Sequence, residues 1–217
     1  MKCKSYSASD GCVRGLKLNR YERKYHNTEI KLISALGVML EHKDFDKISI
    51  SDICREAGVS RTTFYGHCSD TSELLIIAVR VKLDELSDLI KRIGAADIEK
   101  PLSAGRVEDL IKNEILIPFL YCIEDNSQLF LSCFRTTAGQ KAMFNAVNNV
   151  FFMPLVKKNN LVNDKEIRYV SAFFITGLLA IIYEWISGGC KTEKSEICGL
   201  IRRCLGKNHR DAAPEAV

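Results

Sequence analysis

The 217-residue chain is long enough to bury a substantial core, and its 47% hydrophobic and 27% charged residues exclude a largely disordered protein. The formal net charge of +4 does not by itself indicate nucleic-acid binding, but residues 1–25 carry seven basic side chains against two acidic ones. Nine cysteines, with no CxxC pair and no secretory signal, argue against a disulfide framework or a structural zinc site, so we expect reduced, mostly buried thiols in a cytoplasmic protein.

The N-terminal part of the chain divides into a basic extension and a helix. Residues 1–25 have a weak pattern and are predicted to be a mobile extension. It has two readings: an arm that reaches DNA phosphates or the minor groove, or a solubilising tail. The following segment, TEIKLISALGVMLEHK, has apolar residues at three- and four-residue spacing, which predicts a helix with Thr28 as its N-cap.

Residues 51–68, SDICREAGVSRTTFYGHC, contain two short helical patterns around one glycine. Gly58 can adopt the left-handed conformation that ends a helix, and Ser60 can cap a second helix with Phe64 facing inward. Helix, short glycine-containing turn and helix make up the helix-turn-helix unit. Such corners also occur in helical proteins without any DNA-binding role, so the pattern alone leaves both readings open.

The polar residues of the second helix fit a groove-reading role. In a helix-turn-helix unit the second helix lies in the major groove with its N-terminal residues at the base edges. Arg61, Thr62 and Thr63 occupy that end, so we predict that they read bases. Phosphate contacts hold the register, and Tyr65 and His67 can donate to phosphates.

The rest of the chain reads as further helices. Asp70 and Glu73 form a possible capping box for a long helix that ends at Gly94, and 95–106 looks like a connector. Alternation at period two is absent, so the predicted fold class is all-α. We expect a kink or break at Pro118. The helices expected after the connector span 107–123, 127–134, 137–152, 164–187 and 192–205.

The segment 169–186 is almost wholly apolar and only just reaches the length of a membrane-spanning helix. Glu184 lies inside the apolar run. A helix that is buried on all faces within a helical dimer has the same composition, and we favour that reading over a membrane span.

The stretch ISISDICREAGVSRTTFYGHCSDTSELL resembles the DNA-binding signature of the TetR family of bacterial transcriptional regulators, and the resemblance spans about residues 27–80. It implies a three-helix DNA-binding head (26–72), followed by a helical effector-binding and dimerisation body (73–206) and a tail (207–217). It further implies a homodimer that binds a near-palindromic operator and responds to a small molecule. Two positions depart from the family pattern, which often has a lysine where Thr71 stands and a bulky or basic residue at Gly66.

No catalytic or nucleotide-binding motif is present, so neither a cofactor, a metal nor an enzymatic activity is expected. The sequence predicts three groups of site residues. The predicted DNA-binding residues are Ser49, Ser51, Ser60, Arg61, Thr62, Thr63, Tyr65, His67 and Thr71. The predicted dimer interface comprises Ile167, Val170, Phe174, Leu178, Ile181 and Trp185. The predicted effector site comprises Phe119, Tyr121, Phe134 and Arg135.

Two functions remain open at this point. The first is a sequence-specific transcriptional regulator, expected to be a ligand-responsive repressor. The second is a TetR-like co-activator that acts mainly through a protein partner and reads DNA weakly or not at all, which the departures at Gly66 and Thr71 leave possible.

Overall fold

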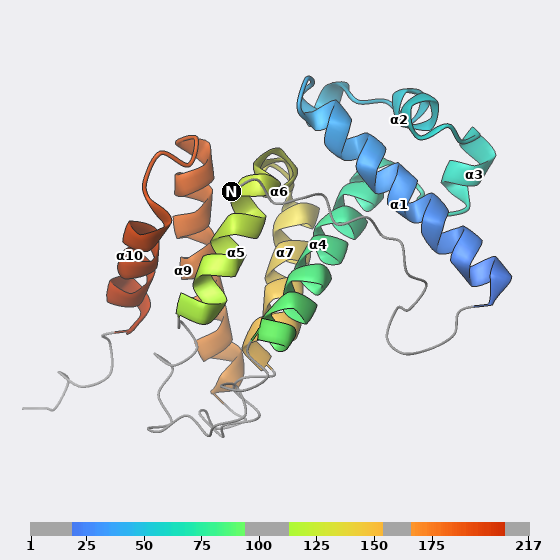
Figure 1. Ribbon diagram of the computed structural model, residues 1–217. Helices are drawn as coiled ribbons and strands as arrows, with labels where there is room; N and C mark the ends of the chain where they lie inside the picture. Colours follow the sequence, from blue (N-terminus) through green and yellow to red (C-terminus); the bar gives the residue numbers. More distant parts are fainter. Residues whose placement is uncertain (1–18, 94–112, 154–165, 207–217) are drawn as a thin grey trace, which may run out of the picture. The chain divides into compact units, whose positions relative to one another are not determined.

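A computed structural model describes residues 19–93, 113–153 and 166–206 (Figure 1). Over these residues the chain forms nine α-helices and no strand, which confirms the all-α prediction. The chain divides into two compact units, residues 1–74 and 75–217, called here the N-terminal and C-terminal units. Residues 1–18, the connector at 95–106 with Gly94, and the tail lie outside the described residues.

The N-terminal unit contains α1 (Arg20–Leu40), a 3₁₀ turn (η1, Phe45–Lys47), α2 (Ile50–Ala57) and α3 (Arg61–Tyr65), and α4 (Thr71–Ile93) begins at its end. Helix α1 packs on α2, and α2 packs on α3. Apolar residues at helical spacing supply the core, as expected. The buried residues include Leu32, Leu36, Leu40, Phe45, Ile53 and Phe64.

Helix α1 begins nine residues earlier than predicted. Asn19 is the N-cap: its Oδ1 accepts hydrogen bonds from the amides of Tyr21 and Glu22 at 2.9 Å, and Glu22 Oε2 accepts from the Asn19 amide at 2.8 Å. Thr28 lies within the helix, where its hydroxyl donates to the Lys24 carbonyl at 3.0 Å. The prediction of Thr28 as N-cap was therefore wrong, because this capping box at 19–22 starts the helix further upstream.

The C-terminal unit contains the rest of α4, then α5 (Asn113–Asp125), α6 (Ser127–Phe134), α7 (Thr137–Val147) with a π-helical end (η3, Asn148–Phe152), α9 (Ile167–Ser187) and α10 (Lys194–Gly206). Helix α10 packs on α5 and α9, and α6 packs on α7 and α9. Helix α5 continues through Pro118, so the helix has no break there. Pro118 has no amide hydrogen, so the Glu114 carbonyl loses its usual donor while the rest of the helix continues.

Helix α9 is the one described helix that is long and apolar enough to cross a membrane, a test of length and composition alone. One face of it is packed inside the unit and includes Ile175, Leu179 and Ile182. It ends at Ser187, as predicted, and Gly189, which follows the C-cap Gly188, has a φ of 76°.

The corner between α6 and α7 has no space for a side chain at Gly139. A Cβ atom at Gly139 would lie 2.4 Å from the Cys133 carbonyl oxygen and 2.8 Å from the Cys133 Cα. Cys133 is itself fully buried, and burial raises the pKa of its thiol to about 12. Four of the seven described cysteines are buried and Cys204 is exposed, so most of these thiols act as small apolar side chains.

Candidate nucleic-acid interface

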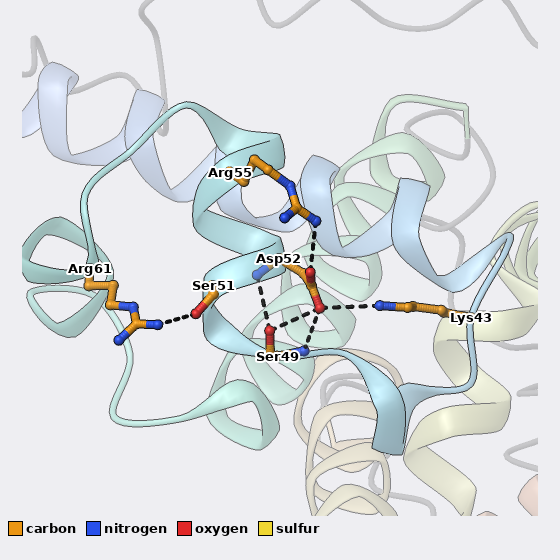
Figure 2. A network of polar contacts seen from close by, with 6 residues as sticks. All are labelled: Lys43, Ser49, Ser51, Asp52, Arg55 and Arg61. Atoms are coloured by element: carbon orange, nitrogen blue, oxygen red, sulfur yellow. Dashed lines mark hydrogen bonds and ion pairs between the residues drawn. The ribbon is translucent and has the colours of Figure 1, made fainter.

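The start of α2 is fixed by a polar network around Asp52 (Figure 2). Ser49 is the N-cap: its Oγ accepts from the Asp52 amide at 3.2 Å, and the Asp52 carboxylate accepts from the Ser49 hydroxyl at 2.9 Å and from its amide at 3.3 Å. The same carboxylate accepts from Lys43 at 3.2 Å and from Arg55 at 2.8 Å. The bonds from Ser49, and after them the one from Lys43, lower the pKa of Asp52 to about 2.

The turn between α2 and α3 has the predicted geometry. Gly58 ends α2 in the left-handed region with a φ of 65°, which a side chain would strain. The Val59 amide donates to the Cys54 carbonyl at 3.0 Å, which closes the end of the helix. Ser60 then caps α3, accepting from the Thr63 amide at 3.0 Å. These bonds hold the two helices as a helix-turn-helix unit.

Helix α3 presents a polar outer face and one apolar anchor. Phe64 is fully buried, whereas Arg61, Thr62 and Tyr65 are exposed. Thr63 is half-buried, and its hydroxyl lies 2.8 Å from the Ser60 hydroxyl. Of the three predicted base-reading residues, Arg61 and Thr62 therefore point outward, and Thr63 is engaged with the cap.

Arg61 and Ser51 form a contact between the two helices. The Arg61 guanidinium donates from Nη2 to the Ser51 hydroxyl, from α3 to α2 (Figure 2). This bond uses one of five guanidinium N–H groups, so an edge remains for an acceptor such as guanine. The Ser51 hydroxyl still carries its own hydrogen, which can donate to a phosphate. The sequence placed both residues at the site but did not indicate that they bind each other.

His67 lies under an aromatic ring from α1. Its ring stacks on Tyr25 with centroids 3.9 Å apart and planes at 27°. Its Nδ1 is buried without a hydrogen-bond partner, and burial lowers the pKa of His67 against the opposing charge of Glu29. Burial thus favours the neutral form of the ring, which can still donate one hydrogen bond to a phosphate.

Sequence reasoning missed Tyr25, which was assigned to the mobile extension. It precedes Leu32 by seven residues and Leu36 by eleven, so all three lie on one face of α1. That spacing was the signal available in the sequence.

The start of α4 completes the predicted set. Thr71 is half-buried at the first position of this helix. Asp70 Oδ1 accepts from the Glu73 amide at 2.8 Å, as a capping box requires. Glu73 reaches the Ser69 amide at 2.7 Å, one residue upstream of the expected partner.

The C-terminal unit contains a groove of about 440 Å³ that includes only one predicted effector residue, Phe134. Phe119 is buried elsewhere, and Arg135 is outside the lining. Tyr121 is also outside the lining and is 51% exposed, with Lys194 Nζ 4.4 Å from its ring centroid. The groove is lined by Phe134, Gln140, Phe144, Thr176, Leu179, Ala180 and Tyr183.

The predicted dimer residues lie beside the buried face of α9, and only one of them is itself buried. Trp185 is buried, and its Nε1 donates to the Thr192 carbonyl at 2.9 Å. Phe174 is half-buried, with its ring 6.3 Å from that of Phe152. The other four, Ile167, Val170, Leu178 and Ile181, are also half-buried. A different stripe of α9 is exposed, including Tyr169 and Phe173.

The capped α2–turn–α3 corner, with exposed Arg61 and Thr62, defines a helix-turn-helix DNA-binding protein. Two family models match the chain: "Bacterial regulatory proteins, tetR family" over residues 23–76, and "Transcriptional regulator C-terminal region" over residues 113–207. The chain belongs to the TetR family of transcriptional regulators. A search of curated proteins by sequence found no significant match.

Solved structures of other regulators share the fold. A TetR-family regulator from Streptomyces coelicolor is 15% identical with a TM-score of 0.57, over 82% of this chain and 78% of that one. FadR from Bacillus subtilis, in complex with stearoyl-CoA, is 15% identical with a TM-score of 0.57, over 83% and 99%. The dihydroxyacetone kinase operon activator DhaS is 20% identical with a TM-score of 0.51, over 82% and 93%.

Proposed function

We propose that this regulator is a cytoplasmic, ligand-responsive repressor that binds a near-palindromic operator as a homodimer. The observation that carries the proposal is the outward face of α3, where Arg61 and Thr62 are exposed at the front of a helix that Ser60 caps and Phe64 anchors. Ser49, Ser51, Tyr65, His67 and Thr71 surround that face and would hold the phosphates.

An exposed apolar stripe on α9 supports the homodimer. It consists of Tyr169, Phe173, Thr176, Ala180 and Tyr183, which follow one another at four- and three-residue spacing. This spacing forms a seam along which a second helix can pack. Tyr169 is 66% exposed and Phe173 is 56% exposed. Contiguous exposed apolar side chains of this kind mark a surface that another protein surface covers. A two-fold dimer would place two α3 helices about 34–36 Å apart.

The groove in the C-terminal unit supports an effector site. It has no charged side chain in its lining, and Phe134, Phe144 and Tyr183 supply aromatic surface. We therefore expect an uncharged, mostly apolar group with one or two hydrogen-bonding atoms, held by Gln140 or Thr176. FadR from Bacillus subtilis, which shares the fold, was solved with the acyl thioester stearoyl-CoA. Because Thr176, Ala180 and Tyr183 belong to both groove and stripe, an occupant can favour one dimer arrangement over another.

A selection from random duplexes, followed by binding measurements on variants, tests the DNA-reading role. Arg61→Ala should lose discrimination of about 1–3 kcal/mol at one base pair of each half-site, because it removes a bidentate contact. Ser51→Ala should lose part of the same discrimination, and the double variant should lose no more than Arg61→Ala alone. Tyr65→Phe, the control, should weaken all duplexes alike.

Unchanged base preference in Arg61→Ala would contradict the assignment. Failure of the wild-type chain to select any duplex would instead favour the co-activator reading, with a protein partner in place of the operator.

The effector groove has its own test. Neutral aromatic and acyl compounds should be titrated by calorimetry, with operator binding followed in parallel. Phe144→Ala should weaken a genuine effector roughly 10- to 100-fold, because it removes an aromatic wall. Tyr121→Ala, an exposed aromatic outside the groove, is the matched control and should leave the affinity unchanged. A compound that binds equally well to both variants, or that leaves operator affinity unchanged, does not act through this groove.

A further inference from the structure

The first three turns of α1 bury no side chain of their own. Every buried residue of α1 lies in its second half, from Leu32 onward. Residues 20–31 thus form a helical segment about 18 Å long, at 1.5 Å per residue, without an apolar face in the core. The segment is continuous with the buried second half of α1, which nucleates the helix, so the segment needs little burial of its own.

Two contacts hold the segment. The Asn19–Glu22 capping box starts the helix, with bonds of 2.8 and 2.9 Å in both directions. Tyr25 stacks on His67, two residues beyond the end of α3. The segment is therefore attached beside the C-terminal end of the recognition helix.

The outer face of this segment is basic. Arg20, Arg23, Lys24 and Lys31, called here the basic stripe, are spaced by three, four and eleven residues from the first, which places them on one side of α1. All four are exposed, and none forms an ion pair with another described residue.

The two acidic residues of the segment do not cancel this charge. Glu22 is used in the capping box, and Glu29 lies 3.8 Å from His26. Both belong to the other side of the helix. The basic stripe therefore presents four uncompensated positive charges over about 17 Å, at 1.5 Å per residue.

We propose that the basic stripe binds the sugar–phosphate backbone of duplex DNA next to the half-site that α3 reads. The proposal rests on the proposed operator-binding function and adds a second surface to it, outside the helix-turn-helix unit. Charge complementarity selects the occupant, since DNA carries one phosphate per about 1.7 Å of its axis. The stripe contacts no base, so it raises affinity and fixes the register but carries no sequence information.

The test uses the full-length chain, a mixed-sequence 40-bp duplex and the operator obtained by selection. The variant Arg20→Gln/Arg23→Gln/Lys24→Gln should reduce the slope of log affinity against log salt by about 3 for each bound protomer, and thus by about 5 for the dimer, at about 0.9 per phosphate released. Affinity at 0.15 M salt should fall roughly 10²-fold for each bound protomer, or about 10⁴-fold for the dimer, by a similar factor for both duplexes. Hydroxyl-radical protection should disappear from the backbone that flanks each half-site.

Two control variants distinguish the effect of the basic stripe from the effects of misfolding and of a lower net charge. Arg20→Lys/Arg23→Lys/Lys24→Arg keeps every charge and should retain the wild-type slope. Arg92→Gln/Lys141→Gln/Lys191→Gln removes the same charge from exposed positions of the C-terminal unit and should also retain it. The proposal is overturned if the salt slope is unchanged in the Arg20/Arg23/Lys24 glutamine variant. It is also overturned if the Arg92/Lys141/Lys191 glutamine variant reduces the slope by the same amount. A wild-type chain that binds neither duplex overturns the operator-binding function as well.

Discussion

Phe173→Glu is expected to convert the proposed homodimer into monomers and to reduce operator affinity by a factor of about 10²–10⁴. The residue lies at the middle of the exposed α9 stripe, with 56% of its surface accessible in one chain. A buried carboxylate facing its symmetry mate across a two-fold seam would be desolvated and repelled by a like charge. Loss of the second half-site contact removes an effective-concentration advantage of about this size. Light scattering and gel shift measure the two effects.

Two further variants show whether the effect is specific to the exposed stripe. Leu89→Glu on α4 is the matched control, because Leu89 is an apolar residue outside the stripe and is 44% exposed. This variant should have the same oligomeric state as the wild-type chain. Phe174→Glu tests the half-buried face of α9 on which the sequence-based dimer prediction lies. Since the Phe174 ring packs near Phe152, we expect reduced folding stability in place of a folded monomer. A folded Phe174→Glu monomer combined with a dimeric Phe173→Glu would contradict the stripe.

Phe64→Ala is expected to destabilise the N-terminal unit by about 3–5 kcal/mol. The ring is completely buried between the helices of the unit and is the only fully buried side chain of α3. Its removal leaves a cavity beneath a five-residue helix that has no other apolar anchor. Because whole domains are stable by only about 5–15 kcal/mol, the unit should lose a large part of its stability and unfold at a clearly lower temperature. Thermal unfolding followed by circular dichroism measures the shift.

The adjacent Tyr65→Ala is the matched control. Tyr65 also carries an aromatic ring on α3 but is 58% exposed, so its truncation should change stability by about 0.5 kcal/mol or less. It should nevertheless weaken duplex binding, since the proposed phosphate donor is lost. Equal destabilisation of both variants would mean that burial of Phe64 does not anchor the recognition helix.

Local chemistry determined the DNA-reading corner, which explains why it was predictable. Gly58 and Ser60 are separated by two positions, and the bonds that they control close within five residues along the chain. The start of α1 was equally local, since the Asn19–Glu22 box closes within four residues, but it lies in a segment whose weak apolar pattern predicted a mobile extension.

Which face of α9 is buried could not be predicted, because its sequence is apolar on nearly every face. Hydrophobic periodicity therefore does not distinguish the buried face from the exposed one. Only the packing of α6, α7 and α10 against it decides that Ile175 and Ile182 are buried and Phe173 exposed. The stack of Tyr25 on His67 joins residues 42 positions apart and likewise has no local signature. By itself the sequence determined the helices, their caps and the helix-turn-helix corner, since these depend on short-range hydrogen bonds. The tertiary structure alone decided which faces remain free to bind, because a face is exposed only where no distant segment covers it.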